Sequence, residues 1–400
     1  MAALVALEEA QRLVLDRIRP LEAERVPVER AAGRVLAEAA ESTTDLPPFP
    51  SSAMDGYAVR AAEAAVGASL PVVARIAAGA PTDRALAPGE AMGISTGGRV
   101  PEGADAVVPI ELVEAQNGIV SIREAVEAGA NVRGAGGDVH AGDTVLGAGR
   151  RLGAAQIGAL AAAGVHEVQC RKRPRVGILV TGSELRQPGE ALGPGEIYES
   201  NGLLLAAALA DAGAVPAQLG VVPDDEDALR RTMERALLGF DMLVTSGGAS
   251  VGPHDLVRKV QAGLRAEEVF WGVAVKPGKP VAFSMRRAHP LFNLPGNPVS
   301  VLVTFEVFVR PAVNALLGVP DPLPAYRLGT LGAAVRRNDR RHEFLRAELR
   351  REDEKVVLEP LVGQESHMIA RAATATALVS VEPGEGEIRA GEPVRYLTLD

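Results

Sequence analysis

The sequence contains little cysteine and few aromatic residues. Only one of its 400 residues is cysteine, Cys170, and only 3% are aromatic. A single cysteine excludes an intrachain disulfide and is typical of proteins from a reducing compartment. We therefore expect a cytoplasmic protein in which Cys170 is inert.

Basic residues are not in excess either. The 42 Lys and Arg residues against 51 Asp and Glu residues give a formal net charge of −9. General nucleic-acid binders carry a basic surface, because contacts with the phosphate backbone supply much of their affinity. The acidic balance therefore argues against this class of protein.

Long apolar segments are also missing. The most apolar stretch, Leu203 to Ala210, is much too short to cross a bilayer. The first residues include Glu8 and Glu9 and do not resemble a secretory signal. A hydrophobic fraction of 47% is still ample for several cores. We expect a soluble protein without a membrane partner, divided into about two to four domains.

Four short apolar runs organise the second half of the chain, and each ends in turn residues. They cover 176–180, 218–222, 242–245 and 291–294, with helical patterns between them. Strands that alternate with helices predict a parallel sheet, whose ligands bind at the carboxyl ends of the strands. The polar residues expected at this edge are Glu184, Asp224, Ser246, Asp255, Lys276 and Lys279. Carboxylates, lysines and glycine turns together suit a phosphate-bearing ligand with a divalent metal.

Other helical patterns have different burial. The stretch 203–212 is apolar on nearly every side, so we expect a buried helix. The longest helical pattern covers 299–317, and 29–39 is predicted as a short helix or strand.

Two further regions are rich in strand signals. Within 70–139, Asn117-Gly118 separates two strand-like runs, which is the strongest short hairpin signal. Beyond a proline-rich linker at 318–324, strand patterns at 344–349 and 356–358 predict a C-terminal β module.

Together with the family resemblance described next, these patterns divide the chain into four expected domains. A helical or mixed linking domain combines 1–45 with 140–173, and a β-rich module with a site loop covers 46–139. A parallel-sheet α/β domain covers 174–320, and the C-terminal β module covers 321–400. The expected fold class is therefore multidomain α/β plus β.

Six motifs carry a resemblance to a known family. They are SAMDGYA at 52–58, TGGRVPEGADAVV at 96–108, TGSEL at 181–185, TSGGASVGPHD at 245–255, KPGKP at 276–280 and LPGNPVS at 294–300. In this order they resemble the molybdopterin molybdenumtransferase family, which includes bacterial MoeA and the E domain of gephyrin. The resemblance covers essentially the whole chain.

The resemblance implies a reaction and an assembly. Such a protein takes molybdate and adenylylated molybdopterin, cleaves the phosphoanhydride with the help of Mg²⁺, inserts the metal and releases AMP. The α/β domain would resemble the stand-alone molybdopterin adenylyltransferase, which is also a possible partner. The protein would be a homodimer whose site faces a loop of the partner's β-rich module.

The resemblance also implies site residues. The catalytic set is Asp55, Asp138, Glu184 and Asp224, of which Asp55, Glu184 and Asp224 would hold Mg²⁺. The substrate-binding set is Thr96, Arg133, Ser246, Gly247, Gly248, Asp255, Lys276, Lys279, Pro295, Pro298, Arg346 and Ser366. Lys276 and Lys279 flank a rigid turn, which favours oxyanion binding, and Pro295 and Pro298 fix the loop between them.

Several of these residues have plainer explanations in the N-terminal half. Asp55 and Thr96 can be turn residues that bond their own backbone, and Gly98 stands where the family often has alanine. Arg133 and Asp138 can be solvated loop charges.

The same holds for the C-terminal half. Glu184 can complement a helix dipole, and Asp224 or Asp255 can cap a helix. Arg346 can extend its charge to solvent from an apolar face. The segment QESHMIARAATATA departs from the family pattern, which leaves the role of Ser366 open, and we expect ordinary polar roles for His254 and His367.

Three rival functions remain open. The α/β motifs alone fit a molybdopterin adenylyltransferase, although the additional modules and SAMDGYA argue against it. A non-catalytic scaffold would bind without turnover, and the intact acidic set argues against such a protein. A preference for tungstate over molybdate is the third.

Overall fold

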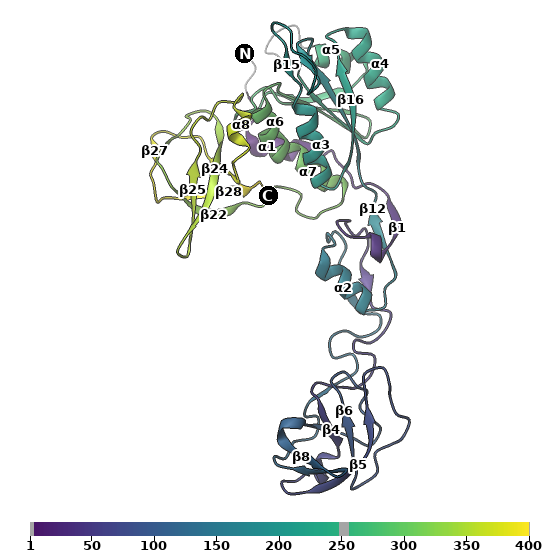
Figure 1. Cartoon of the computed structure of the whole chain (residues 1–400). Coiled ribbons are helices and arrows are strands. Elements are labelled where there is room, and N and C mark those ends of the chain that lie inside the picture. The colour runs from purple at the N-terminus through teal and green to yellow at the C-terminus, as the bar shows by residue number, and fades with distance from the viewer. Residues whose placement is uncertain (1–3, 248–255, 400) are drawn as a thin grey trace. The chain divides into compact units, whose positions relative to one another are not determined.

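The computed structural model describes residues 4–247 and 256–399, and it contains two compact units. One unit comprises Met1–Glu24, Gly33–Val35 and Arg171–Asp400, and the other comprises Arg25–Ala32 and Leu36–Cys170. Each unit is described by itself below (Figure 1).

The larger unit contains a six-stranded sheet in the order β16-β13-β17-β21-β20-β18. The first four strands are parallel and confirm the four predicted runs: β16 (Val215–Val222), β13 (Arg175–Thr181), β17 (Met242–Ser246) and β21 (His289–Leu294). Two antiparallel strands that the sequence patterns missed extend the sheet: β20 (Ala282–Arg286) and β18 (Glu267–Trp271). The sheet is therefore mixed. Its four parallel strands carry the predicted ligand-binding edge, and two antiparallel strands extend it on one side.

Helices cover both faces of this sheet (Figure 1). Alternate side chains of each strand enter different cores: Ile178 and Val244 pack with α3 (Asn201–Asp211), whereas Leu179 and Leu243 pack with other helices. Those other helices are α4 (Glu226–Ala236) and α5 (Leu256–Gly263). The sheet face that α3 covers is also packed by other helical segments. These are α1 (Leu7–Leu15), α6 (Pro298–Thr304), the π-helical turn Phe305–Val309 and α7 (Arg310–Leu316).

The helical run from Pro298 to Leu316 is long and apolar enough to cross a membrane, but 78% of it is buried inside the unit. Its apolar character is therefore explained by the core, and the expectation that the chain lacks long apolar segments was wrong.

Residues 203–212 were predicted as a helix buried on every side. The helix is confirmed, but the prediction of complete burial was wrong. Leu205 and Leu209 are fully buried against the sheet, whereas Leu203 is 49% exposed. Only one face of α3 packs on the sheet. The helix is therefore not buried on every side, although its residues are apolar on nearly every side.

A second sheet of the larger unit is built by the C-terminal residues. Its strands are β19 (Val275–Lys276), β24 (His342–Glu352), β25 (Lys355–Pro360), β22 (Arg327–Leu331), β28 (Pro393–Thr398) and β26 (Ala377–Val381). A pairing of β24 with β26 closes the sheet on itself, which confirms the predicted C-terminal β module. Short elements beside it are β23 (Val335–Arg336), β27 (Glu387–Ile388) and α8 (Ile369–Ala372).

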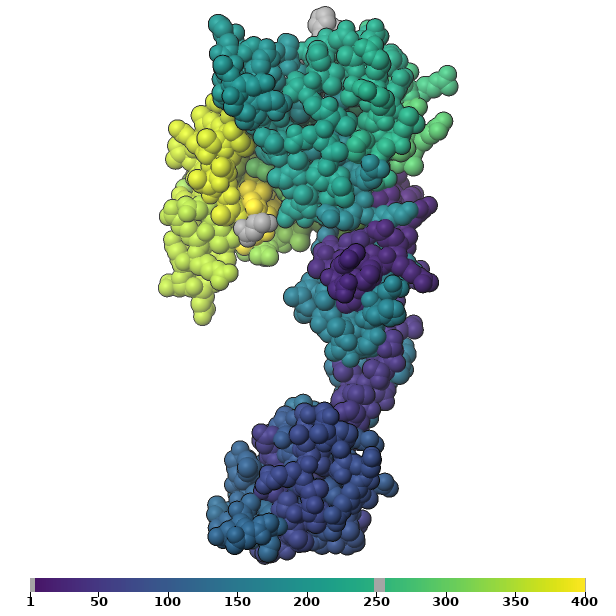
Figure 2. Space-filling view, turned by 45° about the vertical axis from the view of Figure 1, so that its right-hand side comes forward, coloured from purple at the N-terminus to yellow at the C-terminus, as the bar shows by residue number. Residues whose placement is uncertain are grey.

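The two parts of this unit share one core. Phe344, Leu378 and Leu397 of the C-terminal sheet belong to the same buried cluster as Phe292 of β21. Figure 2 shows the yellow C-terminal residues directly beside the teal and green α/β part. The two sheets are therefore held in a fixed relation.

The smaller unit contains a six-stranded sheet in the order β7-β4-β6-β5-β9-β8. Its strands are β7 (Ala106–Pro109), β4 (Gly56–Val59), β6 (Ala91–Ile94), β5 (Ser69–Ile76), β9 (Ile119–Ile122) and β8 (Val113–Gln116). Asn117 and Gly118 have φ of 49° and 77° between the antiparallel strands β8 and β9, which confirms the predicted hairpin.

The remaining elements of the amino-terminal half are short. They are β1 (Ala23–Pro27), β2 (Ala40–Glu41), β3 (Ser51–Ser52), β10 (Val132–Arg133), β11 (Thr144–Leu146), α2 (Ala154–Ala162), β12 (Glu167–Arg171) and the 3-10 turns Val28–Arg30, Ala61–Glu63 and Ile110–Leu112. The prediction of a helix or strand over 29–39 was wrong, because Gly33 has a φ of 75° and interrupts any regular element there.

The burial of α3 predicts how two leucines respond to truncation. Leu205→Ala removes a fully buried side chain and should lower the free energy of unfolding by about 2–5 kcal/mol. Leu203→Ala should change it by less than about 0.5 kcal/mol, because this side chain already contacts solvent. Urea unfolding followed by circular dichroism measures both, and equal losses would contradict the one-sided packing of α3.

Candidate functional site

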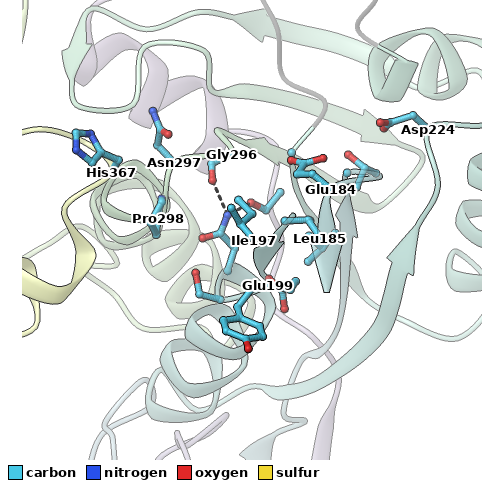
Figure 3. A pocket seen from close by; sticks show the side chains of 17 residues that line it. Glu184, Leu185, Ile197, Glu199, Asp224, Gly296, Asn297, Pro298 and His367 are labelled. Carbon is cyan, nitrogen blue, oxygen red and sulfur yellow. Dashed lines mark hydrogen bonds between the residues drawn. The ribbon is translucent and has the colours of Figure 1, made fainter. Parts of the chain in front are cut away.

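The carboxyl ends of the four parallel strands open into a pocket of about 600 Å³ (Figure 3). Each strand contributes through the turn that follows it. The lining residues from these turns are Gly182 and Glu184 after β13, Asp224 after β16, Ser246 and Gly247 at the end of β17, and Gly296, Asn297 and Pro298 after β21. The structure thus brings together the turns expected at one edge of the sheet.

Glu184 does not lie at a helix N-terminus. The chain after β13 forms the two-residue strand β14 (Leu185–Arg186), which pairs in parallel with β15 (Ile197–Tyr198). The next helix, α3, begins only at Asn201. The helix-dipole explanation for this carboxylate is therefore wrong.

Asp224 does not cap the helix that follows it. The cap is the neighbouring residue, since the Asp225 carboxylate accepts a hydrogen bond of 2.7 Å from the Ala228 N–H. Figure 3 shows Glu184 and Asp224 on the same side of the pocket. Within residues 4–247 and 256–399, neither carboxylate forms a hydrogen bond or ion pair, and both line the pocket.

The opposite side of the pocket depends on Asn201, the first residue of α3. Its Nδ2 donates to the Ser246 hydroxyl at 2.9 Å and to the Gly296 carbonyl at 2.7 Å. The Ser246 hydroxyl in turn donates to the Pro295 carbonyl at 3.1 Å. Asn201 and Ser246 are both buried, so they join the ends of β17 and β21 to the start of α3.

Two further features shape this pocket. Gly247 has a φ of 90°, and a Cβ there would approach the Thr181 carbonyl oxygen to 2.2 Å, so only glycine fits. Glu199, another residue that the sequence analysis missed, is buried and accepts a hydrogen bond of 2.7 Å from the Gly202 N–H. The predicted site residues Gly248 and Asp255 lie outside the described residues, as does His254.

The sequence predicted Lys276 and Lys279 at the same edge of the sheet as the carboxylates. In the structure, neither lysine lines the carboxylate pocket. Lys276 belongs to β19, which pairs in parallel with β24 of the C-terminal sheet. Both lysines line a second pocket of about 570 Å³, together with Pro295 and Ser366. The expectation was wrong because the chain leaves the α/β sheet after β18 and joins the other sheet before it returns.

The two pockets are neighbours, since Asn297 and His367 line both. Asn297 Nδ2 donates to the Ser366 hydroxyl at 2.8 Å, and the Val299 N–H donates to the Ser366 carbonyl at 3.1 Å. These bonds hold the divergent C-terminal segment against the loop after β21. Figure 3 shows His367 and Asn297 on the side away from Glu184 and Asp224.

The position of His367 could not be predicted from the sequence, because a lone histidine in a divergent segment gives no signal of its own. The hydrogen bonds of its neighbour Ser366 to Asn297 and Val299 hold this segment beside the two pockets that His367 lines.

Arg346 is not a solvent-reaching side chain, which corrects the plainer explanation given for it. It is 2% exposed, and its guanidinium donates to the Phe344 carbonyl at 3.4 Å. Burial lowers the pKa of Arg346, while the carboxylates of Glu343 and Glu365 act in the opposite direction. A buried guanidinium of this kind depends on nearby negative charge.

The predicted site residues of the smaller unit lie on adjacent backbone segments. Asp55 Oδ1 accepts hydrogen bonds from the Thr96 N–H at 2.7 Å and from the Thr96 hydroxyl at 3.1 Å. Arg133 is exposed in β10 and pairs with Ser51, and Asp138 is exposed in the loop after β10.

Gly98 of the same unit has a steric explanation. A Cβ at this position would lie 2.8 Å from the Ser95 carbonyl oxygen, so the local backbone favours glycine where the family often has alanine.

Comparisons with known proteins cover nearly the whole chain. Residues 5–164 match the MoeA N-terminal region (domain I and II), residues 177–315 match a probable molybdopterin binding domain, and residues 329–399 match the MoeA C-terminal region (domain IV).

Individual relatives agree. The chain is 37% identical to molybdopterin molybdenumtransferase 2 of Mycobacterium tuberculosis, over 98% of this chain and 99% of the relative. It is 33% identical to the molybdopterin molybdenumtransferase of Haemophilus influenzae, over 98% of each chain. The crystal structure of a molybdopterin biosynthesis MoeA protein from Pyrococcus horikosii aligns over 100% of both chains with a TM-score of 0.83 and 32% identity. The chain therefore belongs to the molybdopterin molybdenumtransferase family, whose members are transferases of molybdenum cofactor biosynthesis.

Proposed function

We propose that this protein inserts molybdate into adenylylated molybdopterin, with cleavage of the phosphoanhydride, release of AMP and assistance by Mg²⁺. One observation carries the proposal: a pocket lined by carboxylates adjoins a pocket lined by lysines, and Asn297 and His367 line both. The carboxylate pocket suits a phosphoanhydride bound together with a metal ion. The neighbouring lysine pocket suits the oxyanion.

The carboxylate pocket fits a magnesium ion held jointly with a substrate. Mg²⁺ commonly binds through one or two carboxylates and completes its shell with substrate phosphates and water. Glu184 and Asp224 supply two such carboxylates, and the described residues contain no group of three or more His, Cys, Asp or Glu that would form a complete metal cage. The ion, when bound, would neutralise phosphate charge, and the chain's own carboxylates would fix its position beside the turns.

The lysine pocket fits a tetrahedral dianion. Lys276, Lys279 and Arg341 line it with positive charge, and Glu365 is the one carboxylate among its lining residues in the described part of the chain. The Ser366 hydroxyl adds a polar group on the same wall. Ammonium groups and donors of this kind bind oxyanions.

Other parts of the proposal rest on the family resemblance. We propose a cytoplasmic homodimer in which Asp55, Thr96, Arg133 and Asp138 contribute to substrate binding or catalysis and Asp55 to metal binding. The four-part domain division and a molybdopterin adenylyltransferase as a partner are proposed on the same ground. Light scattering of the purified protein tests the dimer, and a monomeric mass would contradict it.

The carboxylate assignment predicts a contrast between adjacent aspartates. Glu184→Ala or Asp224→Ala should lower the rate of AMP release at least about tenfold, because each removes a group that positions the phosphoanhydride. Asp225→Ala is the matched control: it should lower helix stability by about 1 kcal/mol through loss of the cap and leave turnover intact. Wild-type turnover in a folded Glu184 or Asp224 variant would remove that residue from the mechanism.

The lysine assignment predicts a difference between two variants. Lys279→Ala should weaken molybdate binding about tenfold or more with little change in melting temperature, since it removes one charge from a half-buried site. Lys276→Ala should weaken binding and also lower the melting temperature, because it leaves the buried Glu343 carboxylate without its ammonium partner. Equilibrium dialysis against molybdate measures the affinity, and an unchanged affinity in both variants would refute an oxyanion pocket here.

A further inference from the structure

The ammonium group of Lys276 is fixed by a buried carboxylate. Its Nζ lies 2.7 Å from Glu343 Oε1, with 43% of the lysine side chain exposed but only 9% of the glutamate side chain. The backbone sets this pairing, since β19 and β24 run in parallel with Lys276 opposite Glu343. On its other side, Glu343 is opposite Val381 of β26, so β24 is held between two strands at this position.

Glu343 also serves a second cation. Arg346 lies three residues further along β24 and is fully buried, and Glu343 is the carboxylate that most strongly opposes the loss of its positive charge. The negatively charged Glu343 carboxylate therefore lies next to Lys276, which lines the oxyanion pocket. Glu343 itself does not line that pocket, so it would act through Lys276 rather than by touching the ligand.

We propose that Glu343 is a positioning residue of the oxyanion pocket, which holds the Lys276 ammonium at the pocket wall and at the same time limits the pocket's affinity for a dianion. The proposal rests on the oxyanion pocket proposed above. An exposed lysine loses side-chain freedom when it binds an anion, and an ammonium already held by a carboxylate has lost part of that freedom. The same carboxylate repels a dianion nearby, which favours release of the oxyanion for transfer over permanent binding.

Two substitutions separate positioning from repulsion. Glu343→Gln keeps an oxygen that accepts a hydrogen bond from Lys276 but removes the negative charge, so molybdate should bind tighter by about threefold or more at low salt. Glu343→Asp keeps the charge but shortens the side chain, so Lys276 loses its contact and molybdate should bind about threefold or more weaker. A residue with only a structural role would move both affinities in the same direction.

The experiment is equilibrium dialysis of the full-length protein against molybdate at low and high salt, with melting temperatures recorded for each variant. Glu348→Gln is the matched control, because Glu348 lies on the same strand and forms an exposed ion pair with Arg350 at 3.1 Å. This control should leave the affinity unchanged.

Each outcome decides the proposal. Tighter binding in Glu343→Gln that diminishes at high salt, with weaker binding in Glu343→Asp, supports it. Unchanged or weaker binding in a folded Glu343→Gln overturns it, and if that variant does not fold, an unchanged affinity in Glu343→Asp overturns it. The Lys279→Ala variant distinguishes this failure from failure of the pocket, since an unchanged affinity there would refute oxyanion binding itself.

Discussion

The hydrogen bonds of Asn201 are the constraint on which the carboxylate pocket depends. One amide group joins the end of β17 through Ser246, the loop after β21 through Gly296, and the first turn of α3. Parallel strands end at a common edge, where open α/β sheets bind their ligands. Because Asn201 and Ser246 are buried, these bonds are protected from water, and the loop that carries Asn297 and Pro298 is fixed relative to the carboxylates.

The same loop connects the two pockets. Asn297 faces the carboxylate pocket and the lysine pocket, and its bond to Ser366 draws the C-terminal segment into the site. The C-terminal sheet thus contributes through two separate contacts, the Ser366 segment and the β19–β24 pairing that carries Lys276. A shared core that includes Phe344 and Phe292 keeps these contacts in register with the α/β sheet.

Much of this arrangement could be predicted from the sequence, because parallel strands and their turns leave local signals. The four apolar runs, the Asn117-Gly118 hairpin and the carboxylates after β13 and β16 follow from residue patterns alone. The lysine pocket could not be predicted in its true place, since Lys276 reaches it by a pairing with a strand more than sixty residues away along the sequence. His367 and Glu343 gave no local signal either, because their environment is set by contacts between segments distant in sequence.

The proposed reaction requires that the oxyanion and the phosphoanhydride are used together in neighbouring pockets. The most direct test gives the wild-type protein adenylylated molybdopterin and Mg²⁺ and measures AMP and active cofactor with and without molybdate. We expect molybdate to accelerate AMP release and metal-containing cofactor to form in proportion to the AMP released. Formation of adenylylated molybdopterin from ATP and molybdopterin, or binding of both reactants without AMP release, would contradict the account.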